Sequence, residues 1–216
     1  MKKIFGILTI FSAVLSTTIA FAQDVTAPST DSRNDFKVGL KAGINLSNVY
    51  DEEGDNFVAE SKVGFAGGMF FEIPFGKFVG FQPEIMYSQK GFKATGNTLL
   101  GSYNYTKTSN YIDLPLLLQL KPFNGFSILA GPQFSYLIST TNDYNGNMST
   151  AQENEINSDN YKRNIFGFTA GLDFNSGNFI ISTRAGWDIS QSDTNGDSTK
   201  PRYKNQVLQL TLGYAF

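Results

Sequence analysis

The chain of 216 residues contains no cysteine and no histidine. Without cysteine it cannot form the disulfides on which many small exported domains depend, and it offers no thiolate ligand for a soft metal. Without histidine it lacks the general base that barrel-type hydrolases and acyltransferases ordinarily use. Paired carboxylates stay available for acid–base chemistry, although such pairs are more often structural. We therefore expect no enzyme, no catalytic residue, no metal site and no cofactor.

A long hydrophobic run is missing everywhere after the first residues. Residues 1–22, "MKKIFGILTIFSAVLSTTIAFA", combine two lysines, a short apolar stretch and the triplet Ala20-Phe21-Ala22. This pattern is typical of a secretory signal peptide that is cleaved before Gln23. A membrane anchor is the alternative, and the shortness of the apolar stretch disfavours it. No later run reaches the ~18 apolar residues of a membrane-spanning helix, so a membrane location requires a closed β-barrel.

An excess of positive charge is also missing. The chain has 17 basic and 19 acidic residues. Loss of the two lysines of the signal peptide leaves 15 against 19, a net charge of −4. A mildly acidic chain is a poor partner for nucleic acid, and we expect none.

The mature chain begins with a polar segment and continues with a period of two. Residues 23–35 are rich in Ser, Thr and Asp, which predicts a flexible leader on the periplasmic side. From residue 36 to residue 216 polar and apolar residues alternate, which predicts one all-β domain. The expected strands span residues 36–46, 62–73, 78–90, 110–121, 126–140, 161–174, 178–190 and 204–216.

The connections between these strands alternate in length. The short ones contain "PFGK", "PFNG" and "NSG", which are hairpin turn sequences. Long connections alternating with short turns are typical of outer-membrane barrels, whose short turns are periplasmic. We therefore predict an eight-stranded antiparallel up-and-down transmembrane β-barrel in a Gram-negative outer membrane, with both termini periplasmic. The long connections are residues 47–61, 91–109, 141–160 and 191–203.

The two faces of the strands differ in a way that predicts which one faces lipid. A soluble periplasmic ligand-binding barrel, with its apolar face inward, is the alternative. The polar face of the first strand carries small and charged residues, such as Gly39, Lys41 and Gly43, which suit a narrow lumen. The apolar face is bulky, and its aromatic residues gather near strand ends, as in the girdles of membrane barrels. The apolar face is therefore expected to contact outer-membrane lipid.

Charged residues of both signs occupy the expected lumen face. Lys41, Glu84 and Arg184 lie near the middle of strands that run in the same direction. We expect Glu84 between the two cations, with Asp113 of the neighbouring strand joining them. Mixed signs do not indicate a sign-selective channel. This network is expected to fill the lumen, with a structural or a gating role.

Three further features are specific to single segments. The last strand ends on Phe216, and a terminal aromatic on an alternating strand resembles the signal recognised by barrel-assembly machinery. Proline occurs inside three consecutive strands, where it cannot donate to the ladder, so we expect bulges or gaps there. "SDTNGDST", in 191–203, begins like a calcium loop but lacks its later ligands, which favours a plain polar loop. The three prolines are Pro83, Pro115 and Pro132.

Four of these strands also resemble a known family. "GLKAGINLS", "FQPEIMYSQKG", "YIDLPLLLQLKP" and "LAGPQFSYL" resemble the porin-family, or PorT-like, outer-membrane β-barrel proteins. The resemblance covers residues 36–216 and implies an outer-membrane location and a role in transport, and one branch of the family is associated with a protein-secretion system. It supplies no catalytic or ligand residue.

These observations leave three functions open. The first is a non-enzymatic barrel with a side-chain-filled lumen that acts in envelope structure or surface interaction through its outer loops. Its extracellular or envelope partner is unknown. The second is a narrow transport channel or a secretion-system accessory, and the third is the soluble periplasmic barrel.

Overall fold

The structure is a computed structural model that describes residues 32–53, 58–98, 101–146, 163–190 and 202–216. The chain divides into two units, Met1–Asp31 and Ser32–Phe216. The second unit is described here. The expected signal peptide, most of the leader and the calcium-like motif lie outside the described residues.

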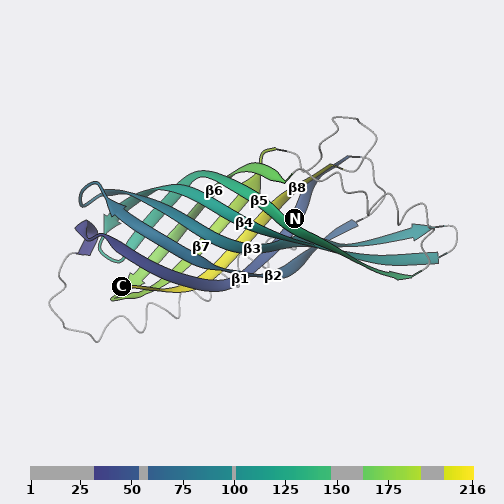
Figure 1. Ribbon diagram of the computed structural model, residues 1–216, viewed down its shortest axis with the longest axis horizontal. Coiled ribbons are helices and arrows are strands. Elements are labelled where there is room, and N and C mark those ends of the chain that lie inside the picture. The colour runs from purple at the N-terminus through teal and green to yellow at the C-terminus, as the bar shows by residue number, and fades with distance from the viewer. Residues whose placement is uncertain (1–31, 54–57, 99–100, 147–162, 191–201) are drawn as a thin grey trace. The chain divides into compact units, whose positions relative to one another are not determined.

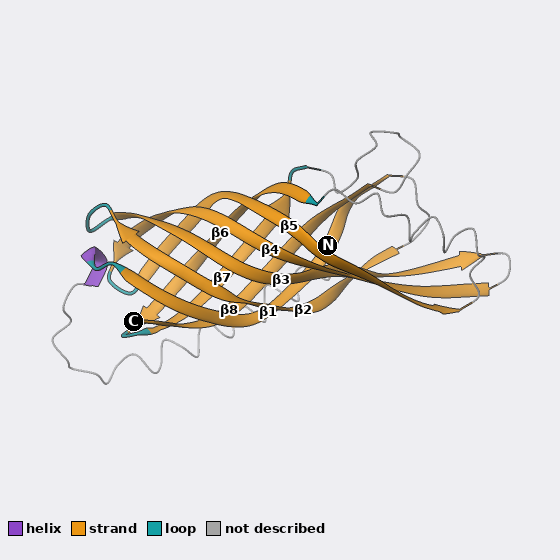
Figure 2. Ribbon diagram, in the orientation of Figure 1, coloured by secondary structure: helices purple, strands orange, loops and turns teal. Residues whose placement is uncertain are grey.

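Eight strands form one closed antiparallel barrel, in which each strand pairs with the next and β8 pairs with β1 (Figures 1 and 2). This confirms the predicted fold class. The strands are β1 (Lys37–Glu53), β2 (Val58–Pro74), β3 (Val79–Thr98), β4 (Gly101–Phe123), β5 (Phe126–Gly146), β6 (Asn164–Ser176), β7 (Phe179–Asp188) and β8 (Arg202–Ala215).

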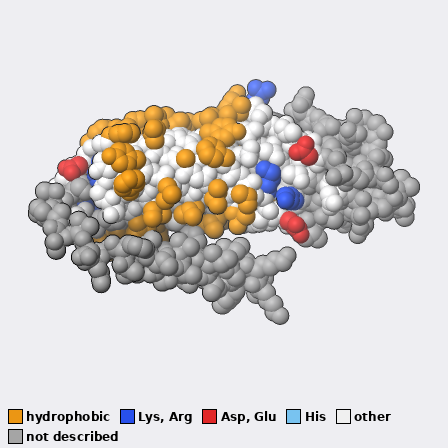
Figure 3. Space-filling view, turned by 90° about the horizontal axis from the view of Figure 1, so that it is seen from below, with side chains coloured by type: hydrophobic (Ala, Val, Ile, Leu, Met, Phe, Trp, Pro, Cys, Tyr) orange, Lys and Arg blue, Asp and Glu red, His pale blue; other side chains and the backbone are white. Residues whose placement is uncertain are grey.

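The barrel is apolar outside and polar inside, as the alternation predicted. In β4 every second residue from Tyr111 to Lys121 is buried in the lumen. The leucines between them face outward and are 37–52 % exposed. Hydrophobic side chains gather in a broad band on the face seen in Figure 3. A soluble protein buries its leucines and exposes its charges, whereas this barrel does the reverse. Lipid around the barrel favours this arrangement.

Aromatic side chains surround the end of the barrel that carries the short turns. Six phenylalanines there are 59–73 % exposed. Phe123 stacks on Phe126, whose ring also contacts Phe174, with centroids 5.0 Å apart in both pairs. Near the other end Tyr136 and Trp187 are exposed on the outer face. The two groups match the aromatic girdles of a membrane barrel. The six are Phe36, Phe75, Phe78, Phe123, Phe179 and Phe216.

The strands at the other end, the long-loop end, are longer than predicted. The β3–β4 hairpin has two residues, 99–100, between its strands, so most of the expected loop 91–109 is strand. β1, β2 and β5 also extend into expected loops. Figure 1 shows β3, β4 and β5 continuing together past the ends of the other strands. Outside lipid both faces of a strand meet water, so the apolar–polar alternation that predicts a strand is lost there.

The mid-strand prolines interrupt the ladder without shifting it. Pairing between β3 and β4 passes from Pro83↔Leu116 to Met86↔Asp113, and the register is the same on both sides of the gap. Pairing between β4 and β5 shows a similar gap after Pro115↔Gln133. Of the two expected outcomes, a bulge or a gap, the gap is therefore found. Missing proline N–H groups remove ladder bonds, while the neighbouring strand pairs hold the register.

A short 3₁₀ turn, η1 (Ser32–Asn34), precedes β1 at the short-turn end. The Lys121 ammonium donates to the Arg33 carbonyl at 2.9 Å, and the Arg33 guanidinium lies 5.2 Å from the centre of the Phe78 ring. The last part of the predicted leader thus contacts the barrel. The described residues include no helix with the length and hydropathy of a membrane span, a finding that does not bear on β-barrels.

Candidate functional site

The candidate site is the charged lumen, which is formed by the inward-facing residues of the strands. Glycine on the lumen face makes room for the long charged side chains. A Cβ at Gly171 would lie 2.7 Å from the Arg184 Cδ atom and 2.0 Å from the Thr183 carbonyl oxygen. A side chain at position 171 would therefore clash with Arg184 and with the backbone of β7.

The first group of buried charges is centred on Glu84 of β3. One Glu84 carboxylate oxygen lies 2.7 Å from the Lys41 ammonium of β1, and the other accepts from Arg184 of β7 at 2.9 Å. Arg184 also pairs with Asp173 of β6 at 2.5 Å. All four side chains are less than 5 % exposed. We call Lys41, Glu84, Asp173 and Arg184 the Glu84 cluster, whose two cations and two carboxylates balance.

Amide side chains continue this cluster around the lumen. The Gln82 amide donates to Glu84 at 3.0 Å and to Asp173 at 3.1 Å. Gln119 donates to Gln82 at 3.2 Å and to the Ser127 hydroxyl at 3.1 Å. Contacts therefore run between β1, β3, β4, β5, β6 and β7. A buried charge network stabilises a protein when its members are paired and hydrogen-bonded in this way.

A second group lies nearer the long-loop end. The Lys90 ammonium contacts the Asp113 carboxylate at 3.0 Å, donates to the Ser135 hydroxyl at 3.3 Å and lies 4.8 Å from the centre of the Tyr111 ring. Asp188 accepts from the Asn205 amide at 2.6 Å. We call Lys90, Tyr111, Asp113 and Ser135 the Lys90 cluster.

Asp113 is the one predicted network member that the structure places elsewhere. Lys41, Glu84 and Arg184 meet, but Asp113 pairs with Lys90 and not with either predicted cation. The register sets Asp113 opposite Met86, one inward position beyond Glu84 toward the long-loop end. At that level the flexible Lys90 side chain reaches Asp113, so the expectation that Asp113 joins Glu84 is wrong.

Apolar side chains in the lumen pack against both charged clusters. Phe70, Ile180 and Ala215 form one buried cluster, and the Lys41 ammonium lies 5.9 Å from the centre of the Phe70 ring. Tyr111, Leu137 and Ile165 form another. Hydrophobic layers of this kind exclude hydrated ions, because an ion in them loses its hydration shell.

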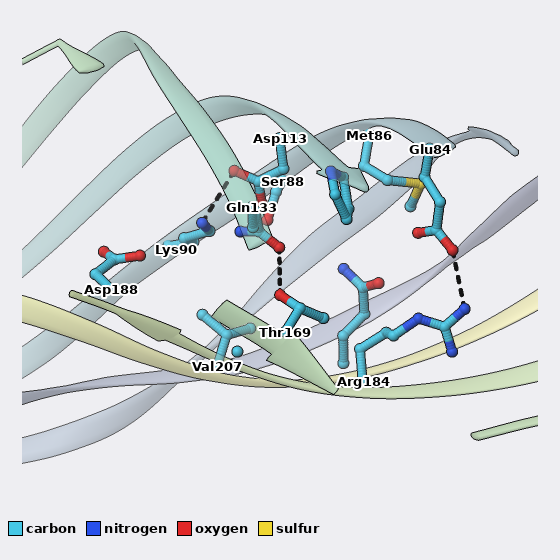
Figure 4. A pocket seen from close by; sticks show the side chains of 13 residues that line it. Glu84, Met86, Ser88, Lys90, Asp113, Gln133, Thr169, Arg184, Asp188 and Val207 are labelled. Carbon is cyan, nitrogen blue, oxygen red and sulfur yellow. Dashed lines mark hydrogen bonds and ion pairs between the residues drawn. The ribbon is translucent and has the colours of Figure 1, made fainter. Parts of the chain in front are cut away.

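A small cavity separates the two charged clusters. Its volume is about 20 Å³, and its lining includes Glu84 and Arg184 at one side and Lys90, Asp113 and Asp188 at the other (Figure 4). The buried Arg184 Nε atom has no hydrogen-bond partner among the described protein atoms. A cavity of this size has room for about one water molecule beside its charged lining.

The short-turn mouth of the lumen has charges of its own. The Lys37 ammonium lies 3.9 Å from the Glu72 carboxylate, and Glu72 is almost fully buried. Lys121 is held by the η1 carbonyl described above. Paired charged side chains therefore extend through the lumen to its short-turn mouth.

Phe216, the predicted assembly signal, lies exposed at the same end. Its backbone N–H donates to the Val38 carbonyl at 2.8 Å, which closes β8 on β1 to the last residue. Its ring contacts Tyr214, and Tyr214 contacts Phe179, with centroids 5.5 Å and 5.3 Å apart. The geometry gives Phe216 a structural role in the girdle, and its role in assembly stays a prediction.

The sequence pattern had placed Asp173 on the lumen face without naming it as a partner of Arg184, and it had not indicated the two glutamines. Gln82 and Gln119 occupy inward positions of β3 and β4, so the period-two pattern was the available signal. Among the described residues no three acidic side chains are grouped so as to hold a metal ion. The lumen is thus a site of ion pairs and hydrogen bonds.

Three solved structures with similar folds are distant in sequence. Ail of Yersinia pestis is 14 % identical, with 83 % of this chain and 98 % of that chain covered and a TM-score of 0.46. OprG of Pseudomonas aeruginosa is 15 % identical, with 83 % and 95 % covered and a TM-score of 0.43. Outer membrane protein W of E. coli is 17 % identical, with 83 % and 97 % covered and a TM-score of 0.40.

A comparison with curated proteins gives no match. The narrower resemblance to PorT-like proteins stays a prediction. The model of the outer membrane protein beta-barrel domain matches residues 21–194, which is more than half of the chain. The chain therefore belongs to this family of outer-membrane β-barrel proteins.

Proposed function

We propose that this outer-membrane barrel has a closed lumen and acts through the strands and loops of its long-loop end, in envelope structure or surface interaction. In this proposal the long-loop end faces the cell exterior, and both termini are periplasmic. No reaction is assigned, because the chain lacks histidine and cysteine. Barrel-assembly machinery and outer-membrane lipid are its proposed partners during and after insertion.

The Glu84 cluster is the main observation in support of a closed lumen. It links β1, β3, β6 and β7 by contacts of 2.5–2.9 Å. The interior of an eight-stranded barrel is narrow enough for its own side chains to fill. The cavity of about 20 Å³ beside the cluster leaves room for water alone. A hydrated ion would have to break several buried ion pairs to pass.

Conductance in planar lipid bilayers tests the closed lumen. We expect the purified full-length mature barrel to give no steady ionic current, because no continuous aqueous path crosses the clusters. Proteoliposomes should also remain closed to small sugars in a swelling assay. A reproducible single-channel current from the wild-type barrel would contradict the closed lumen and favour the transport alternative.

A further inference from the structure

A second cavity lies at the short-turn end of the lumen, and we call it the mouth cavity. Its volume is about 10 Å³, and it shares no lining residue with the cavity between the two charged clusters. A space of this size admits one water molecule or a chemical group of similar size, such as a primary ammonium. Its lining includes Arg33 of η1, Lys37 of β1, Glu72 of β2, Lys121 of β4, Phe126 of β5 and Asn175 of β6.

Two residues of the mouth cavity have a buried oxygen atom that lacks a donor. Glu72 Oε1 and Asn175 Oδ1 have no hydrogen-bond partner among the described protein atoms. The other Glu72 oxygen lies 3.9 Å from the Lys37 ammonium, which is a loose contact. The Gln119 amide lies beside Glu72, but its nitrogen donates to other lumen side chains. A buried oxygen without a donor is costly, so these two atoms favour a ligand that carries N–H or O–H groups.

Cations predominate around the same cavity. Arg33, Lys37 and Lys121 line it, and Glu72 is the one acid in its described lining. Three cations against one carboxylate give the lining a charge of +2, and Asp35, which acts electrostatically on Lys121, lowers the local excess to +1. Lysine and arginine are the side chains that ordinarily bind phosphate. The mouth cavity thus combines acceptors that need donors with cations that favour an anion.

The mouth cavity borders the aromatic girdle of the short-turn end. Phe123 and Phe126 line the cavity and stack on each other with centroids 5.0 Å apart, and the Phe123 ring is exposed. The Arg33 guanidinium lies 5.2 Å from the centre of the Phe78 ring, which is also exposed. Aromatic girdles lie at the level of the lipid headgroups. Lipid headgroups are therefore the molecules that meet this cavity from the membrane side.

We propose that the mouth cavity binds the headgroup of a phosphatidylethanolamine molecule. The primary ammonium of the headgroup enters the cavity and donates to Glu72 Oε1 and Asn175 Oδ1. The phosphate stays at the rim with the cations of the lining. This inference goes beyond the closed lumen and the surface role, and it depends on neither. In the cell it requires that the short-turn end meets the phospholipid leaflet, as the proposed orientation provides.

Native mass spectrometry of the purified mature barrel tests the selectivity. The barrel is released from detergent micelles that contain equal amounts of phosphatidylethanolamine and phosphatidylcholine with the same acyl chains. Phosphatidylcholine has the same phosphate and net charge, but its trimethylated nitrogen has no N–H group. We expect one phosphatidylethanolamine per barrel, retained about tenfold over phosphatidylcholine, because a charge-assisted hydrogen bond is at stake. Equal retention of the two lipids would overturn the proposal, because nonspecific lipid contact would then suffice.

Two further ligands separate the headgroup chemistry from its source. Phosphatidylglycerol carries hydroxyl donors and a net negative charge but no ammonium, and it should be retained less than phosphatidylethanolamine. Soluble glycerophosphoethanolamine has the same headgroup without acyl chains, and at equal concentration it should not displace the lipid. Equal or stronger retention of phosphatidylglycerol would overturn the ammonium contact. Displacement by the soluble headgroup would overturn the lipid as the source of the ligand.

Three variants assign the site to its residues. Asn175→Ala removes one acceptor and should lower the preference for phosphatidylethanolamine over phosphatidylcholine to about twofold. Lys121→Gln should weaken retention of both lipids and leave the preference, because both carry the phosphate. Lys77→Gln removes an exposed cation of the β2–β3 turn, outside the cavity lining, and as the control it should change neither quantity.

Heat-dependent gel migration establishes that each variant is folded before its lipids are compared. Equal losses in Lys121→Gln and Lys77→Gln would overturn the site, because a general attraction of this end for phosphate would then suffice. An unchanged preference in Asn175→Ala would overturn the assigned acceptor. The comparison of lipids on the wild-type barrel decides the proposal even where a variant does not fold. All of these measurements use the purified barrel, so their failure leaves the proposed orientation and surface role untouched.

Discussion

Glu84 pairs with two cations, of which one has a second carboxylate partner and the other has not. Arg184 has a second carboxylate, Asp173, at 2.5 Å, whereas Glu84 is the one carboxylate in ion-pair contact with Lys41 among the described residues. Removal of the Glu84 carboxylate therefore leaves Lys41 as the uncompensated cation, with the Phe70 ring as its neighbour. Lys41 therefore depends on Glu84 for charge compensation more than Arg184 does.

Glu84→Ala should lower the free energy of unfolding by about 3–5 kcal/mol, the usual cost of breaking a buried ion pair. Lys41→Met in the same chain should recover a large part of this loss, because methionine carries no charge and suits the apolar neighbourhood. Urea unfolding of the barrel in lipid vesicles measures both effects. Glu60→Ala, which removes an exposed glutamate of β2, is the control and should change stability by less than about 0.5 kcal/mol. Equal midpoints for the wild type, the single variant and the double variant would contradict the assigned pairing.

At the scale of elements, β8 differs from the other strands because it closes the barrel. It pairs with β7 and β1, and the hydrogen bond from Phe216 to Val38 is its last contact. The ring of Phe216 is 73 % exposed, so its removal costs little buried area. An effect of Phe216 on assembly should therefore exceed its effect on the stability of the folded barrel.

Phe216→Ala should reduce the amount of barrel in outer-membrane fractions several-fold, if the terminal aromatic is recognised during insertion. Phe75→Ala is the matched control, because Phe75 is an equally exposed ring of the same girdle on another strand pair. Quantitative blots give the amount, and heat-dependent gel migration gives the folded fraction. Equal amounts of both variants would remove the assembly role and leave Phe216 as a girdle residue.

For the whole molecule, the closed barrel of eight strands gives the two ends different properties. The short-turn end carries the aromatic girdle, the η1 turn and the last residue. The long-loop end carries the extended β3–β5 sheet, where Lys93, Asn104 and Asp143 are exposed. The long-loop end lies in water on one side of the membrane. The orientation of the barrel decides whether that side is the periplasm or the cell exterior.

Cysteine labelling on intact cells should show the orientation, and the absence of native cysteine makes every introduced thiol unique. Asn104→Cys, at an exposed position of β4, should react with a membrane-impermeant maleimide. Asn124→Cys, in the exposed short turn between β4 and β5, should react only after the outer membrane is permeabilised. The reverse pattern would contradict the proposed orientation and, with it, the proposed surface role of the long-loop end.

The sequence by itself determined the number of strands, their alternating faces and the meeting of Lys41, Glu84 and Arg184 in the lumen. Alternation carries this information because each membrane-embedded residue faces either lipid or the lumen, and the two environments select opposite chemistry. A buried charge is costly unless it is paired, so the charged residues at mid-strand are expected to contact one another in the lumen.

Tertiary structure alone decided the partner of Asp113 and the lengths of β3, β4 and β5. The stagger between neighbouring strands sets which inward residues share a level, and a difference of one inward position moved Asp113 from Glu84 to Lys90. Beyond the membrane both faces of the sheet meet water, so the side-chain pattern no longer distinguishes strand from loop. There the hydrogen bonds between neighbouring strands, such as those of Asn110 with Tyr87 and Ser139, continue the sheet, and only the assembled barrel brings those strands together.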